Sequence, residues 1–141
     1  LQAVPHAVAQ RPDAAGVIKM RVDNFKQMGG AMRTLGAQAR ADSVDLPATR
    51  QAAAVIARHA PNIPRWFPRG SGPDSGVPTR AKAEIWSDAR TFQAAAVRLR
   101  QESAAFARTA AGTDQAAIKA GIRNIGASCS NCHDRFRGPE L

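Results

Sequence analysis

The 141-residue sequence has little of several residue types that particular fold classes need. Only two cysteines are present, too few to hold together a disulfide scaffold. Aromatic residues make up 5% and tyrosine is absent, while alanine, a strong helix former with low strand propensity, supplies much of the apolar content. No run of about 18 apolar residues occurs, which excludes a membrane-spanning helix. A disulfide-stapled scaffold and a β-sandwich or barrel are therefore disfavoured.

Acidic residues are also scarce, since 11 Asp and Glu oppose 20 Lys and Arg and leave a net charge of +9. This balance is compatible with nucleic acid, an anionic cofactor or an acidic protein as partner. Aromatic residues are not interleaved with the basic ones, so no nucleic-acid binding is expected. Arg98, Arg100 and Arg108 fall on exposed helical faces, where we expect them to be solvated, although a basic surface can steer an acidic redox partner.

The apolar pattern predicts an all-α fold, an antiparallel four-helix bundle in residues 14–141. Helices are expected from Asp13, as N-cap, to about residue 36, over 47–60, from Thr79, as N-cap, to Gly112, and from residue 113 or 114 to about 137. Residues 61–78, rich in proline and glycine, are predicted to form a loop. Residues 1–13 are either an N-terminal arm or the remnant of an export signal, because they contain a small-x-small triplet.

The first predicted helix has an apolar face that two glycines interrupt. Gly29 and Gly30 each cost about 1 kcal/mol against alanine in a helix interior, which suggests that another group approaches closely there. The residues of the face recur three or four apart: Ile18, Val22, Phe25, Met28, Met32 and Leu35.

The fourth predicted helix carries both cysteines on its apolar face, and residues 129–133 read Cys-Ser-Asn-Cys-His. C-x-x-C-H is the pattern of c-type haem attachment. Positions i and i+3 lie on one side of a helix, so Cys129 and Cys132 can both form thioethers with the vinyl groups of one haem. His133 shares that face, where its imidazole can ligate the iron. One covalent haem c is therefore predicted.

Other uses of paired cysteines fit this sequence less well. A thioredoxin-type dithiol lies at the start of a helix within a βαβ unit, and the sequence predicts neither feature here. Structural zinc needs further ligands, but no other cysteine exists, and His6 and His59 lie in other segments. A disulfide within one helical turn would be strained.

The group on the other side of the iron decides between two functions. A methionine there suits electron transfer, and Met20, Met28 and Met32 are candidates, although core packing is the commoner role of methionine. His59 is another conceivable ligand. Phe25 cannot ligate iron, and as a shield it would leave an open position for a small gas.

Four segments together resemble one family. They are Arg21 with Phe25 four residues later, residues 63–68 (Ile-Pro-Arg-Trp-Phe-Pro), residues 83–87 (Ala-Glu-Ile-Trp-Ser) and residues 129–137. The chain is similar in them to the cytochromes c′, class II c-type cytochromes with a four-helix bundle and a C-terminal haem motif. The resemblance covers about residues 10–137.

The resemblance implies that Cys129 and Cys132 hold the haem and that His133 is the proximal ligand. Phe25 matches the distal position, where low-spin members have a ligating methionine and high-spin members a bulky apolar residue. A five-coordinate, high-spin iron is therefore expected, with a six-coordinate methionine-ligated electron carrier as the alternative.

Further positions match residues around the haem. Arg21 matches a contact of a haem propionate, for which charge-assisted pairing gives a physical reason. Thr79 and Arg80 match a region at the haem edge. Arg137 matches a basic residue beside the proximal imidazole, and it also suits a helix C-terminus. Trp86 and Phe92 are interpreted as packing residues.

The implied function is electron transfer, binding of nitric oxide or carbon monoxide, or both, in the periplasm. A periplasmic redox partner is one expected interaction. Another is a homodimer, for which Met20, Met28, Met32 and Val44 would supply an apolar patch. No enzymatic activity is expected, because the sequence has no distal acid–base pair of the peroxidase kind. A cofactor-free helical binding module with a basic face is the alternative from a different class.

Overall fold

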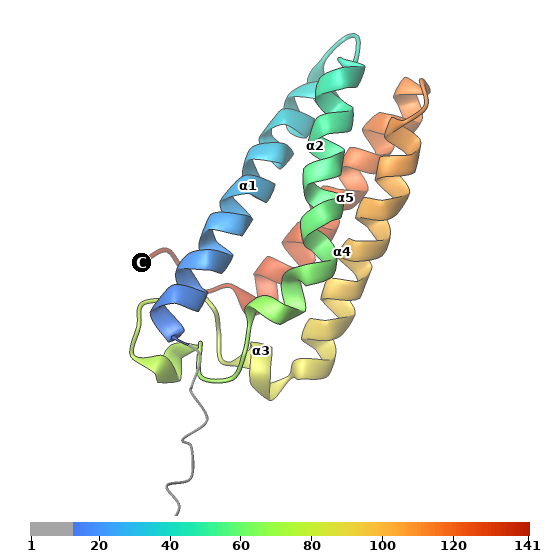
Figure 1. Cartoon of the computed structure of the whole chain (residues 1–141). Coiled ribbons are helices and arrows are strands. Elements are labelled where there is room, and N and C mark those ends of the chain that lie inside the picture. The colour runs from blue at the N-terminus through green and yellow to red at the C-terminus, as the bar shows by residue number, and fades with distance from the viewer. Residues whose placement is uncertain (1–12) are drawn as a thin grey trace, which may run out of the picture.

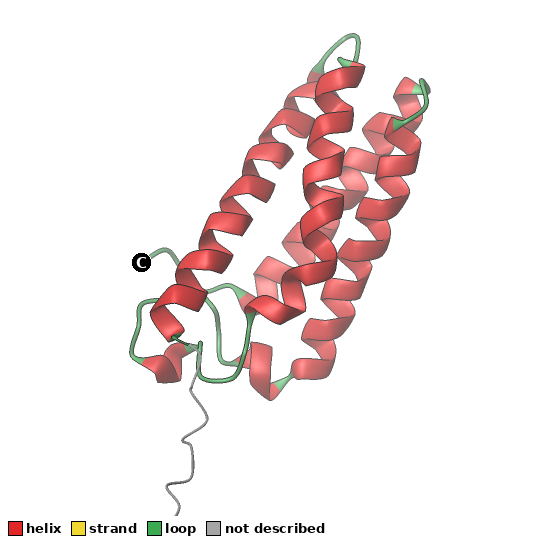
Figure 2. Ribbon diagram, in the orientation of Figure 1, coloured by secondary structure: helices red, strands yellow, loops and turns green. Residues whose placement is uncertain are grey.

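The computed structural model describes residues 13–141, which form four long helices and several short ones (Figure 1). The long helices are α1 (Ala14–Arg40), α2 (Leu46–His59), α4 (Ala89–Ala110) and α5 (Gln115–Phe136). Between α2 and α4 lie two 3₁₀ segments, η1 (Ala60–Trp66) and η2 (Pro73–Ser75), and the single turn α3 (Glu84–Ser87). The described part contains no β-strand (Figure 2), so the predicted all-α class is confirmed.

The long helices make an antiparallel bundle in which α1 packs on α2, α2 on α4, α4 on α5 and α5 on α1. Short connections join α1 to α2 and α4 to α5 at one end of the bundle (Figure 1). The long connection from η1 to α3 lies at the opposite end, together with the start of α1 and the end of α5. We call this second end the site end, because it brings together the sequence segments that carry the candidate residues.

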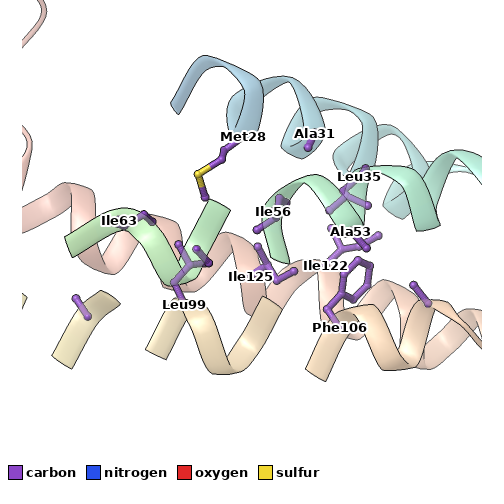
Figure 3. Close-up of a cluster of buried hydrophobic side chains, with 14 of the residues drawn as sticks. Met28, Ala31, Leu35, Ala53, Ile56, Ile63, Leu99, Phe106, Ile122 and Ile125 are labelled. Carbon is purple, nitrogen blue, oxygen red and sulfur yellow. The ribbon is translucent and has the colours of Figure 1, made fainter. Parts of the chain in front are cut away.

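Aliphatic side chains from all four long helices fill the core (Figure 3). Leu35, Ile56, Ile118 and Ile125 are fully buried, and each such burial contributes about 1.5–3 kcal/mol. Met28 also points into this cluster. It therefore packs as a gap-filling core residue, as methionine commonly does.

At one level of the bundle α4 and α5 approach closely. An ideal Cβ added at Gly121 would lie 2.6 Å from Cδ2 of Phe106, closer than real Cβ atoms come. Phe106 is buried and lies over the glycine, so a side chain there would push the ring out of place.

Cationic side chains close the helix termini at the end opposite the site. Nε of Arg50 donates to the Ala110 carbonyl at 2.7 Å, and its Nη2 donates to the carbonyls of Ala111 at 3.2 Å and Gly112 at 3.1 Å. Nζ of Lys119 donates to the Ala41 carbonyl at 2.6 Å. These bonds satisfy carbonyls that have no partner within their own helix.

The start of the third helix differs from the sequence-based expectation. Thr79 does not cap a helix. Its hydroxyl instead accepts hydrogen bonds from Arg21 and from the backbone N–H of Ala81. Helical structure begins only at Glu84 and is interrupted at Asp88, whose φ of −122° and ψ of 53° are not helical. The predicted loop over residues 61–78 also contains 3₁₀ turns at η1 and η2.

Two expectations for α1 are wrong and a third holds in part. Val22 is 42% exposed and its neighbour Arg21 takes the inward position at 2% exposure. Gly29 and Gly30 have only the side chain of an arginine on their own helix nearby within the described residues, so no other group approaches them closely. Asp13 is the N-cap residue of α1, as predicted, and its carbonyl accepts from the N–H of Val17, but its side chain makes no capping hydrogen bond. The remainder of the predicted N-terminal segment, including His6, lies outside the described residues.

Candidate functional site

The two cysteines and the histidine of the C-x-x-C-H motif lie in the last two turns of α5. Asp114 starts this helix, its Oδ1 accepting a hydrogen bond from the N–H of Ala117 at 3.1 Å. Buried isoleucines at three- and four-residue spacing turn one face of α5 to the core, so Cys129 and Cys132 on that face become half-buried. Both are free thiols packed against the core.

Burial favours the protonated form of both thiols. It raises the pKa of Cys129, and it raises the pKa of Cys132 to about 11, with Cys129 adding to the effect. Thiol–disulfide exchange needs a stabilised thiolate. The environment therefore does not favour dithiol redox chemistry.

His133 is half-buried beside the cysteines and favours its neutral form. Its pKa is lowered first by burial and then by the positive charges of Arg137 and Arg80, against a small opposing effect of Asp134. A neutral imidazole keeps a nitrogen lone pair, which a metal ion requires of a histidine ligand.

A backbone clamp holds the end of α5 against residues 80–82. Nε of Arg80 donates to the Gly138 carbonyl at 3.1 Å, and the N–H of Gly138 donates to the Arg80 carbonyl at 2.6 Å. The N–H of Lys82 donates to the Phe136 carbonyl at 3.0 Å, and Ala81 and Arg137 form an isolated antiparallel bridge. This clamp holds Arg80 and the exposed Arg137 near the imidazole, as their effect on its pKa indicates.

Arg21, in the second turn of α1, is buried although it is charged. Its Nη1 donates to the Trp66 carbonyl at 3.2 Å and to Ser71 Oγ at 2.8 Å, and its Nη2 donates to the Ser71 carbonyl at 2.6 Å and to Thr79 Oγ1 at 3.0 Å. The guanidinium also lies 4.5 Å above the centre of the Phe67 ring. All of these acceptors are neutral, and burial lowers the pKa of Arg21 to about 10.

A buried cation of this kind calls for an anion. In the described part of the chain, carboxylates pair only with Lys19 and Arg135. Arg21 has no carboxylate partner there, and the desolvation of its charge is offset only by neutral acceptors and by the face of the Phe67 ring.

Phe25 lies one turn after Arg21 and is half-buried among aromatic rings. The Trp66 ring meets it edge-on, with centroids 5.2 Å apart and planes at 89°, and the tilted Phe67 ring lies 6.1 Å away. Phe67 in turn packs against Phe92 at 5.1 Å, and Trp86 donates a hydrogen bond to the Phe67 carbonyl. Trp86 and Phe92 are thus packing residues, as predicted.

The structure brings most of the predicted residues together at the site end. Thr79 bonds Arg21, while Arg80 and Arg137 lie by His133, so residues 79–82 link the two groups. Sequence reasoning missed the roles of Trp66, Phe67 and Ser71. Trp66 and Phe67 lie in residues 63–68, one of the segments that carry the family resemblance. Ser71 lies in a glycine-rich loop, and no sequence pattern indicates that such a serine contacts Arg21.

The methionines and His59 do not support the six-coordinate alternative. Met20 is 37% exposed and its sulfur accepts a hydrogen bond from Asn24, Met28 is buried in the core, and Met32 is half-buried against it. Nε2 of His59 is hydrogen-bonded to Oε1 of Gln27 at 2.8 Å. Met28 and Val44 are both core residues, so the apolar patch predicted for a dimer is smaller than expected.

The donor set fits a haem. Two thiols one turn apart on one helix face suit two vinyl groups, a neutral imidazole beside them suits iron, and a buried guanidinium without an anion suits a propionate. Among the residues the structure describes, no three His, Cys, Asp or Glu side chains group to hold a metal ion directly. Nor does any described helix have the length and apolar character needed to cross a bilayer.

A four-helix bundle with C-x-x-C-H on the core side of its last helix defines a c-type haem protein of the bundle class. The family model described as Cytochrome C' matches residues 16–137, so the chain belongs to the cytochrome c′ family. This family binds haem c covalently, and the chain has two cysteines, both in the motif. The predicted family and cofactor are confirmed.

Individual relatives agree with this assignment. The chain is 32% identical over 125 residues to cytochrome c-556 of Agrobacterium fabrum, covering 88% of this chain and 82% of that protein. It is 30% identical over 131 residues to cytochrome c′ of Rhodospirillum rubrum, covering 92% and 87%. The structure of cytochrome c′ from Shewanella frigidimarina matches with a TM-score of 0.83 at 26% identity, over 92% of this chain and 99% of that one.

Proposed function

We propose that this cytochrome c′ family member is a periplasmic protein that binds a small gas, nitric oxide or carbon monoxide, at a five-coordinate haem iron. One observation carries the proposal: the residue one turn after the buried Arg21 is Phe25, and its ring is packed among other aromatic rings. A residue that ligated the iron from this position would need a sulfur or nitrogen atom. A phenyl ring supplies no such atom.

The residues of the motif would hold the cofactor. Cys129 and Cys132 would form the thioethers, and His133, kept neutral by burial and by two nearby cations, would be the axial ligand. When bound, the haem supplies an iron centre with one position free for a diatomic ligand. The clamp between residues 80–82 and the chain after α5 would keep the imidazole in one orientation.

On α1, Arg21 would meet a haem propionate. Its four Nη hydrogens are engaged with Trp66, Ser71 and Thr79, which leaves Nε–H to donate to the propionate. The side chain is thereby already fixed, so little of its freedom remains to be lost when the anion arrives. Phe25 would stand over the open side and keep water and large ligands away. Arg80 and Thr79 would lie at the haem edge.

Electron transfer is a second candidate function, favoured by the net charge of +9. Arg98, Arg100 and Arg108 are exposed, as predicted, and they would help to attract an acidic periplasmic redox partner. Periplasmic location is inferred because thioether attachment of haem takes place outside the cytoplasm. A homodimer would use the exposed Met20 and Val22 of α1.

Absorption spectra of the reduced haem protein, with and without carbon monoxide or nitric oxide, test the proposal. The expected result is a five-coordinate, high-spin spectrum that changes on addition of the gas. A six-coordinate, low-spin spectrum before gas is added would overturn it. The variant Phe25→Met is the matched control, because it places a ligating sulfur at that position and should give the low-spin spectrum.

Haem attachment is tested separately with the pyridine haemochrome assay. The natural chain should show covalent haem bound through two thioethers. Cys129→Ser and Cys132→Ser should each leave one thioether, visible as a shift of the haemochrome band toward that of a haem with one unreacted vinyl group. An unshifted band in either variant would contradict the assigned role of that cysteine.

A further inference from the structure

Trp66 contacts both α1 residues assigned to the haem. Its backbone carbonyl accepts a hydrogen bond from Arg21, and its ring meets Phe25 edge-on at 5.2 Å. The residue ends η1 and is 6% exposed, so its indole has no solvent to move into. Trp66, which belongs to η1, thus contacts both the guanidinium of Arg21 and the ring of Phe25, which lie one turn apart on α1.

The indole also contacts an imidazole that is tied back to α1. The His59 ring lies edge-on at 5.6 Å from Trp66, and Nε2 of His59 is 2.8 Å from Oε1 of Gln27. Gln27 follows Phe25 by two residues on the same helix. The contacts therefore form a closed loop, from Phe25 to Trp66, to His59, to Gln27 and back along α1.

This loop restricts the ring of Phe25. Trp66 and Phe67 pack against it, and Phe67 is itself held by the guanidinium of Arg21 and by Phe92. Under the proposed function a gas would reach the iron on the side that Phe25 covers, so the ring would have to turn to admit it. A ring packed against fixed aromatic neighbours turns only if one of them moves.

We infer that Trp66 is a positioning residue that sets how readily Phe25 admits a gas, and that His59 and Gln27 hold Trp66 in place from the protein surface. The inference rests on the proposed function, since it concerns access to the same iron. Trp66 acts through Phe25 and needs no contact with the gas itself.

The test measures the association rate of carbon monoxide with the reduced haem protein after flash photolysis. Trp66→Phe keeps the backbone carbonyl that binds Arg21 but removes the indole edge, and it should raise the rate about two- to tenfold, the range that one lost edge-to-face contact corresponds to. His59→Phe and Gln27→Ala release the indole without changing the core beneath it, and they should raise the rate by less.

A double-mutant comparison separates positioning from general loosening. Phe25→Ala should raise the rate by itself, and Trp66→Phe should add nothing in that background, because the ring it positions is gone. Phe106→Leu is the matched control, since it also trims a buried aromatic residue but lies far along α4 from the site end. It should lower the melting temperature and leave the rate unchanged.

Two results would overturn the inference while leaving the proposed function intact. One is an unchanged rate in Trp66→Phe when Phe25→Ala raises it, and the other is an equal rise from Trp66→Phe with and without the Phe25 ring. An association rate that is unchanged in Phe25→Ala would also overturn the inference, because the ring would then not control gas entry. If the natural protein is six-coordinate or binds no gas, the proposed function fails instead.

Discussion

Arg21 offers the sharpest test of how the site end is held together. We predict that Arg21→Met, which keeps the length of the side chain and removes its charge and donors, strongly destabilises the protein. The guanidinium makes four hydrogen bonds, to Trp66, to Ser71 twice and to Thr79. It therefore ties α1 to the end of η1 and to two points of the connection that follows.

The size of the loss follows from what is left behind. Two carbonyls and two hydroxyls lose a charged donor, and each buried acceptor left without a partner costs about 1 kcal/mol at the low end of the usual range, so the four together destabilise by about 3 to 5 kcal/mol. The burial that lowers the pKa of Arg21 to about 10 opposes the native arrangement, so the loss stays below the sum of four charged hydrogen bonds. At roughly 3 °C per kcal/mol for a chain of this size, the melting temperature should fall by about 9 to 15 °C.

Thermal unfolding of the haem protein followed by circular dichroism measures this fall. Arg21→Lys should lie between the natural chain and Arg21→Met, because a lysine keeps the charge but cannot reach the acceptors as a planar fork. Arg65→Met is the control, since Arg65 is an exposed arginine of η1. If Arg21→Met shifts the midpoint no more than Arg65→Met does, the reasoning about the buried cation is wrong.

Three further predictions concern packing, helix ends and pH. Gly121→Ala should lower the free energy of unfolding by about 1 kcal/mol, because the clash with Phe106 outweighs the gain in helix propensity, whereas Gly29→Ala should raise it by about 0.5 to 1 kcal/mol in urea titrations. Arg50→Ala should lower it by about 1 to 2 kcal/mol in the same assay, since three terminal carbonyls lose their donor. Burial lowers the pKa of His59 below 6.5, so the unfolded chain binds the proton more readily than the folded chain does. The free energy of unfolding should therefore fall as the pH drops through 6.5, and it should fall less steeply in His59→Gln. Equal effects of the two glycine variants, an unchanged Arg50→Ala, or identical pH slopes would contradict the respective arguments.

The local features of the site were predictable because they depend on spacing along one helix. Cys129, Cys132 and His133 share a face through the helical period alone, and the isoleucines before them turn that face to the core. Asp114 starts α5, as its position before an apolar period predicts. These features depend on no other part of the chain, so they could be predicted from the sequence of α5 alone.

The partners of Arg21 were not predictable in the same way. A helical pattern places apolar residues inward, which assigned Val22 to the core, yet Arg21 is the buried one. The reason lies 45 to 58 residues further along the chain, where its acceptors are. Two of these acceptors are backbone carbonyls, which every residue has and no sequence pattern marks. Thr79 illustrates the same competition, because its hydroxyl serves Arg21 and a turn instead of capping a helix.

The two ends of the bundle therefore rely on different interactions. Opposite the site, cations such as Arg50 and Lys119 bind exposed helix termini, where each charge stays partly hydrated and little desolvation opposes it. At the site end Arg21 is desolvated, and it lacks an anion among the described residues. A haem propionate would supply this anion, and because the thioethers keep the haem attached to the unfolded chain as well, it would stabilise the fold as an intramolecular ion pair with Arg21. Arg21 thus holds the site end together through its hydrogen bonds, while the desolvation of its charge is a cost that a propionate would offset.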